Sequence, residues 1–101
     1  MSEKSLMRDL RAFTDDRDWD RFHSPENLSK SIAIESAELL ECFQWGHEPD
    51  LVRVQEELAD VLTYSYLLAE KLGLEPEAIV RAKLEKTATK YPAPQSAPSP
   101  E

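Results

Sequence analysis

The sequence predicts an all-α protein, and three observations support this fold class. Long segments between residues 3 and 90 lack glycine and proline and are rich in Glu, Leu, Ala and Lys, which have high helix propensity. Apolar residues recur in these segments at spacings of three and four, the period of an amphipathic helix. Both glycines of the chain, Gly46 and Gly73, fall between the segments, where helices would begin and end.

The first two helices have recognisable ends. A helix over residues 3–16 would place Leu6, Leu10 and Phe13 along one stripe, with charged residues opposite. A second helix begins after Ser24, a favourable N-cap residue, with proline at the first helical position. We expect it to run to about residue 44, because Trp-Gly-His-Glu-Pro follows at residues 45–49.

The third and fourth helices occupy most of the second half of the chain. The third is expected from about residue 50 to 72, where Gly73 is placed to cap its C-terminus. The fourth begins at Pro76 and runs to about Lys90, before the Tyr-Pro step at 91–92. We expect one helical domain over residues 1–91 and a disordered proline-rich tail over residues 92–101.

Composition excludes several classes of protein. The formal charge of -8 opposes binding along a nucleic-acid polymer. One cysteine and two histidines exclude a disulfide framework and the usual Cys/His zinc site, and two glycines cannot build a glycine-rich phosphate loop. No apolar run is long enough to span a membrane, and the N-terminus lacks a signal-peptide core. We therefore expect a soluble, cytoplasmic protein with no membrane partner.

Acidic residues occupy positions on the apolar side of two helices. Glu35 and Glu38 do so on the second helix, and Glu57 and Asp60 on the third. One such pair is most often a solvated face. Two pairs on consecutive antiparallel helices would cluster four carboxylates, which is unfavourable unless cations compensate. Oxygen ligands suit Mg²⁺, Mn²⁺ or Ca²⁺, so the pattern favours a site for a divalent cation.

Two further groups flank these acids. Aromatic residues on both sides of the second helix suit either core packing or stacking on a planar base; they are Trp19, Phe22, His23, Phe43 and Trp45. Basic residues lie along the fourth helix. They suit either a solvated face near the helix C-terminus or a phosphate site; they are Arg81, Lys83, Lys86 and Lys90.

Three segments carry a specific resemblance. Residues 18–28 (DWDRFHSPENL), 34–45 (IESAELLECFQW) and 56–62 (EELADVL) closely resemble the MazG-like nucleotide pyrophosphohydrolases, particularly the dCTP pyrophosphatase branch. The resemblance spans residues 18–92. It implies a four-helix bundle protomer that assembles as a dimer or tetramer with shared sites. It also implies hydrolysis of a nucleoside triphosphate to the monophosphate and pyrophosphate.

The resemblance also assigns roles to individual residues. It makes Glu35, Glu38, Glu57 and Asp60 ligands of Mg²⁺, for which Mn²⁺ could substitute, and we add Glu41 as an outer ligand or proton acceptor. It places four further residues at or near the nucleotide pocket, Trp19, His23, Trp45 and Tyr64. It gives Lys83 and Lys90 as candidates for phosphate contacts. The sequence departs from the family at Thr87, where asparagine is usual.

The expected function is a Mg²⁺-dependent dNTP pyrophosphohydrolase that cleans the nucleotide pool, with dCTP or a 5-modified dCTP as first substrate. A preference for dUTP or for a broad range of dNTPs is the alternative within that activity. Outside it, the alternatives are a non-catalytic regulator that binds nucleotide or metal, and a helical interaction module whose acids form only a solvated face.

Overall fold

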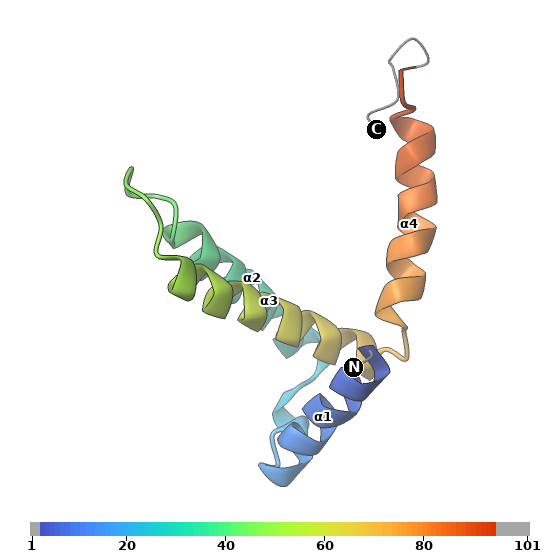
Figure 1. The fold of residues 1–101 in the computed structure, drawn as a ribbon. Helices are drawn as coiled ribbons and strands as arrows, with labels where there is room; N and C mark the ends of the chain where they lie inside the picture. The colour runs from blue at the N-terminus through green and yellow to red at the C-terminus, as the bar shows by residue number, and fades with distance from the viewer. Residues whose placement is uncertain (1–2, 95–101) are drawn as a thin grey trace.

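The structure is a computed structural model that describes residues 3–94. Within this range it consists of helices without strands, as predicted, and Figure 1 shows their arrangement. The elements are α1 (Glu3–Asp16), the short 3₁₀ helix η1 (Asp20–Phe22), α2 (Pro25–Glu41), α3 (Leu51–Lys71) and α4 (Pro76–Lys90). Residues 92–94 have no regular secondary structure, and the rest of the expected tail lies outside the described residues. The division into a domain over 1–91 and a tail stays a prediction.

The second helix begins as predicted and ends earlier. The Ser24 hydroxyl oxygen accepts a hydrogen bond from the Asn27 N–H at 3.1 Å, which satisfies one free donor at the helix start. The helix ends at Glu41 and not at residue 44, because the next three N–H groups bond three residues back instead of four. Gly46, with φ of +75°, then reverses the chain.

The third helix is fixed at both ends. The Asp50 carboxylate accepts a hydrogen bond from the Val52 N–H at 3.0 Å, so the helix proper begins at Leu51. At the other end Gly73 adopts a φ of +70°, as expected for a glycine that follows a helix C-terminus.

The helices α2 and α3 pack side by side as an antiparallel hairpin, and α1 packs across the C-terminal half of α3 (Figure 1). The core of the described chain is small. Leu28 of α2 is 1% exposed, and Leu67 and Ala69 of α3 are also buried. One polar residue, Thr14, is buried within residues 4–94, and its hydroxyl donates to the Arg11 carbonyl at 3.0 Å. A core this small buries little apolar surface for a chain of this length.

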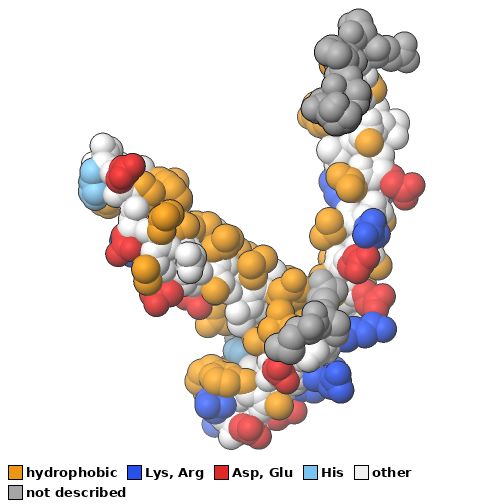
Figure 2. Space-filling model, viewed as in Figure 1, with side chains coloured by type: hydrophobic (Ala, Val, Ile, Leu, Met, Phe, Trp, Pro, Cys, Tyr) orange, Lys and Arg blue, Asp and Glu red, His pale blue; other side chains and the backbone are white. Residues whose placement is uncertain are grey.

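The expected four-helix bundle is not closed within a single chain. The fourth helix leaves the end of α3 at an open angle to the α2–α3 hairpin and contains no buried residue (Figure 1). The side of α3 that could receive it is partly covered by α1 at the C-terminal end, and the rest stays exposed. Figure 2 shows hydrophobic side chains along the edge of the hairpin that faces α4. Both sides of the angle are therefore available to another chain.

No helix within residues 3–94 combines the length and the apolar character needed to cross a lipid bilayer.

Leu28 is the most completely buried side chain of the described core, so its truncation should be costly. We expect Leu28→Ala to lower the free energy of unfolding by about 2–5 kcal/mol through lost burial and a residual cavity. Denaturant unfolding followed by circular dichroism measures this. Val52→Ala, at an exposed position of α3, is the control and should cost much less. Equal losses in the two variants would contradict this description of the core.

Candidate active site

Three carboxylates from two helices meet on the α2–α3 hairpin. One oxygen each from Glu35 of α2 and from Glu57 and Asp60 of α3 lie within 4.8 Å of one another. The antiparallel packing places the predicted acid pairs of the two helices opposite each other. The Glu57 side chain is only 14% exposed, and Glu35 is partly buried, whereas Asp60 is open to solvent. We call Glu35, Glu57 and Asp60 the acidic group.

The fourth predicted ligand, Glu38, lies near this group but is not part of it. Its charge acts on both Glu35 and Glu57, which places it in their electrostatic surroundings. Its oxygens are not among those that meet within 4.8 Å. The structure thus brings three of the four predicted ligands together.

Burial and mutual repulsion make the acidic group unfavourable when it carries its full negative charge. Loss of solvent is the main cause that raises the pKa of Glu35, and repulsion from Glu38, Asp60 and Glu57 raises it further. The pKa of Glu57 is raised for the same reasons, first by burial and then by Glu38, while a nearby arginine opposes the shift.

The donor set of the acidic group fits a divalent cation. All three candidate ligand atoms are carboxylate oxygens, the donors that Mg²⁺, Mn²⁺ and Ca²⁺ prefer. A cation bound between them would offset the repulsion that raises the pKa of Glu35 and of Glu57. The group could therefore hold a divalent metal ion.

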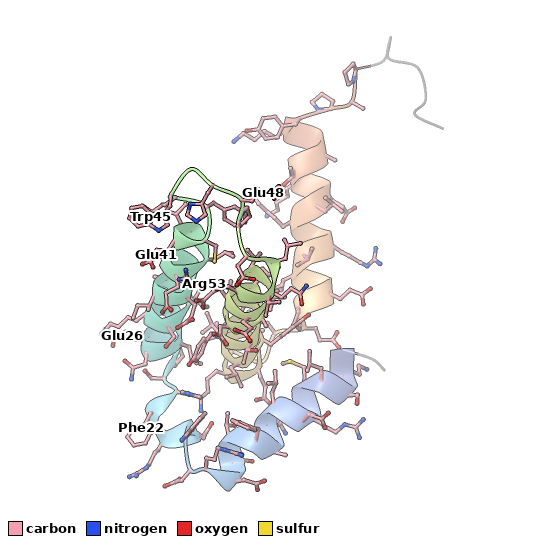
Figure 3. All side chains as sticks on the ribbon, turned by 60° about the vertical axis from the view of Figure 1, so that its left-hand side comes forward. Phe22, Glu26, Glu41, Trp45, Glu48 and Arg53 are labelled. Carbon is pink, nitrogen blue, oxygen red and sulfur yellow. The ribbon has the colours of Figure 1, made fainter. Side chains whose placement is uncertain are left out.

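Arg53 is a residue of this site that the sequence reasoning missed. Its Nη2 lies 3.5 Å from Glu41 Oε1, and its Nε lies 3.8 Å from Glu57 Oε2. Figure 3 shows Arg53 between α2 and α3, on the side of Glu41. Arg53 and Glu57 are four residues apart on one helix, and this spacing could have predicted their contact from the sequence. The contact with Glu41 was not visible in the sequence, because it depends on the register between α2 and α3. Glu41 itself lies in this ion pair and outside the acidic group.

An aromatic cavity of about 200 Å³ adjoins the acidic group and shares Asp60 with it. Three of the four predicted pocket residues, Trp19, His23 and Tyr64, line it. The rings of His23 and Tyr64 meet edge to face, with centroids 6.4 Å apart. The remaining lining residues, mostly apolar, are Leu10, Phe13, Thr14, Thr63 and Leu67. We call this space the aromatic cavity; its walls suit one planar ring.

The short helix η1 holds one wall of the aromatic cavity in place. The Asp20 carboxylate accepts a hydrogen bond from Lys71 Nζ at 2.6 Å, which ties η1 to the end of α3. That contact is the main reason why the pKa of Asp20 is lowered. Trp19 and His23 flank η1; the His23 ring meets Tyr64 of α3, and the Trp19 ring meets Phe13 of α1 edge to face, with centroids 5.5 Å apart.

Tyr64 links the cavity to the acidic group electrostatically. Burial is the main cause that raises the pKa of its phenol, and the charges of Glu35 and Asp60 raise it further. The hydroxyl therefore stays protonated at neutral pH and can donate a hydrogen bond.

Three predicted site residues are not brought to the acidic group within one chain. Trp45 is 70% exposed in the segment after α2, at the tip of the hairpin (Figure 3). Lys83 and Lys90 lie on α4, which extends away from the hairpin (Figure 1). Within the described chain, the lining of the aromatic cavity includes none of the three.

The raised pKa of Glu35 predicts how stability depends on pH when metal is removed. A carboxyl whose pKa is higher in the folded state stabilises the fold while it is protonated, and this contribution is lost as the pH rises above its usual pKa near 4.5. Glu35→Gln imitates the protonated form. We expect the variant to melt at a higher temperature than the wild type at pH 7 in a chelator, with the difference vanishing near pH 4. A wild type that is equally stable at pH 7 would contradict the expected repulsion.

Comparisons with known proteins show which proteins the chain is similar to. The model of the MazG-like family matches residues 30–98. Human dCTP pyrophosphatase 1 is 34% identical over 106 residues, covering 91% of this chain and 62% of its own length. The Bos taurus protein of the same name is 32% identical, with coverage of 90% and 62%. The chain thus spans less than two thirds of the curated relatives it matches.

A solved structure is similar over almost all of both chains. The crystal structure of a pyrophosphatase from Archaeoglobus fulgidus matches with a TM-score of 0.83 and 41% sequence identity. The match covers 89% of this chain and 92% of the other. Because the family model spans α3, α4 and most of α2, including every member of the acidic group, the chain belongs to the MazG-like family.

Proposed function

We propose that this protein hydrolyses deoxynucleoside triphosphates to the monophosphate and pyrophosphate with Mg²⁺, for which Mn²⁺ can substitute. The observation that carries this proposal is that the acidic group and the aromatic cavity share Asp60. A site for cations thereby adjoins a site for a planar ring, as a nucleotide requires. The names of the relatives, dCTP pyrophosphatase 1 and pyrophosphatase, support the same reaction and favour dCTP or a 5-modified dCTP.

Each part of the site has a role in this proposal. Glu35, Glu57 and Asp60, with Glu38 beside them, hold the cations. Mg²⁺ bound there supplies charge compensation for the triphosphate and lowers the pKa of a water molecule. Glu41, exposed at the end of α2, is our candidate outer ligand or proton acceptor.

The aromatic cavity orients the base in this proposal. Trp19 and His23 stack against it, and the Tyr64 hydroxyl donates a hydrogen bond. With the base held there, the α-phosphate lies toward Asp60. Water loses a proton to the acceptor and adds to the α-phosphorus; the bond from this atom to the oxygen that bridges to the β-phosphate breaks, and its electron pair leaves with pyrophosphate.

We also propose that the protein works as a homo-oligomer, a dimer or tetramer. The fourth helix buries no residue, and Val80 and Leu84 on it are exposed, as are Leu58 and Leu62 on α3. Exposed apolar surface of this extent is typical of an interface between subunits. Packing of a second copy into the open angle would also give Trp45, Lys83 and Lys90 a route to a nucleotide.

The activity is tested by the products. Incubation with each dNTP and Mg²⁺ should release pyrophosphate and not orthophosphate, with dCTP or 5-methyl-dCTP turned over fastest. Glu35→Gln should lower the rate by about two orders of magnitude or more, because it removes a metal ligand. Glu26→Gln is the matched control on the same helix, where Glu26 forms only an exposed pair with Lys30 at 3.7 Å. Release of orthophosphate alone, or equal rates in Glu35→Gln and Glu26→Gln, would contradict the proposal.

The oligomeric state has its own test. Light scattering coupled to size exclusion should give a mass at micromolar concentration of at least twice the 11.5 kDa chain. Val80→Asp together with Leu84→Asp should lower that mass, because two charges cannot be buried unpaired in an apolar contact. A wild type of 11.5 kDa would contradict the proposed assembly.

A further inference from the structure

Arg53 differs from the other basic residues in the acids that it contacts. Within residues 4–94 it is the one basic side chain in ion-pair contact with an acid of the candidate site. It reaches Glu41 on α2 and Glu57 on α3, and it is still 45% exposed (Figure 3). Basic side chains in the other ion pairs of the described chain contact acids outside the site, as Lys71 does with Asp20. The role of Arg53 is not accounted for by the proposed chemistry so far.

The present contacts of Arg53 are weak and exchangeable. A guanidinium carries five N–H donors in a planar fork, and the distances of 3.5 and 3.8 Å involve one nitrogen each. The pair that joins the two helices, Arg53 with Glu41, is 45% and 52% exposed, so solvent weakens it and it does not lock α2 to α3. In addition, Glu57 cannot neutralise Arg53 fully while its carboxylate also serves a cation. Arg53 therefore has donors to offer to an anion.

The order of residues along α3 indicates which anion. Arg53, Glu57, Asp60 and Tyr64 follow one another at spacings of four, three and four, so they lie along one face of the helix. At 1.5 Å per residue, Arg53 and Tyr64 are roughly 16 Å apart along the axis. Tyr64 lines the aromatic cavity, and the acidic group lies between. A nucleotide with its base in the cavity and its phosphates at the acids would point its terminal phosphates toward Arg53.

We infer that Arg53 is a substrate-binding residue whose guanidinium binds the β- and γ-phosphates, the part of the substrate that leaves as pyrophosphate. This inference rests on the proposed function. A guanidinium suits the task because its fork can donate two parallel hydrogen bonds to a phosphate. When the bond between the α-phosphorus and the bridging oxygen breaks, the electron pair goes to the pyrophosphate. Arg53 then stabilises the negative charge that develops on the pyrophosphate.

Separate binding of the two products tests the inference. Isothermal titration calorimetry in Mg²⁺ would measure the affinities of the wild type and of Arg53→Gln for pyrophosphate and for dCMP. We expect the variant to bind pyrophosphate about tenfold more weakly and dCMP as tightly as the wild type. The matched control is Lys30→Gln, because Lys30 also pairs with a glutamate four residues away, Glu26, at 3.7 Å on α2. That variant should bind both products like the wild type.

The possible results are all decisive. Unchanged affinity for pyrophosphate in Arg53→Gln, an equal loss for both products, or no binding of pyrophosphate to the wild type would overturn the inference. If Arg53→Gln does not fold, Arg53→Lys keeps the charge without the planar fork, and its affinity for pyrophosphate should fall at least about twofold; an unchanged value would again overturn it. A wild type that binds pyrophosphate through Arg53 but releases none from any dNTP would contradict the proposed reaction alone.

Discussion

The antiparallel contact between α2 and α3 is the constraint on which the rest of the site depends. On either helix alone, the predicted acid pair would be an ordinary charged face. Their register brings Glu35 opposite Glu57 and Asp60, and it lets Arg53 reach Glu41 across the hairpin. Leu28, almost fully buried, is part of the core that holds this register. A shift of one helical turn between the helices would separate the acids.

Placing these carboxylates together costs stability, and the cost is tied to what the site does. Burial and repulsion raise the pKa of Glu35 and Glu57, so the full negative charge of the acidic group is unfavourable. A cation bound there would relieve this repulsion, which favours its binding. The net charge of -8 would oppose a triphosphate elsewhere on the chain. In the proposed function, the negative charge at the acidic group recruits the cations that allow a triphosphate to bind there.

Helix positions, the N-cap at Ser24 and the glycine after α3 follow from local rules, and so they were predictable from the sequence. The acid pairs were predictable because carboxylates among apolar residues violate the helical pattern. The end of α2 at Glu41 was not, since it depends on a change to tighter hydrogen bonds over the next three residues. The open position of α4 and the contact between Arg53 and Glu41 depend on tertiary geometry that no single helix encodes.

The tie between Asp20 and Lys71 gives the two halves of the site different sensitivities. It is a solvent-exposed ion pair, and dissolved salt screens such pairs. It holds the segment that carries Trp19 and His23, whereas the charge of the acidic group on the hairpin responds to pH and to a bound cation. In the proposed function, ionic strength would then loosen the wall around the base without loosening the metal ligands. Discrimination between bases would become a property that dissolved salt tunes separately from bond cleavage.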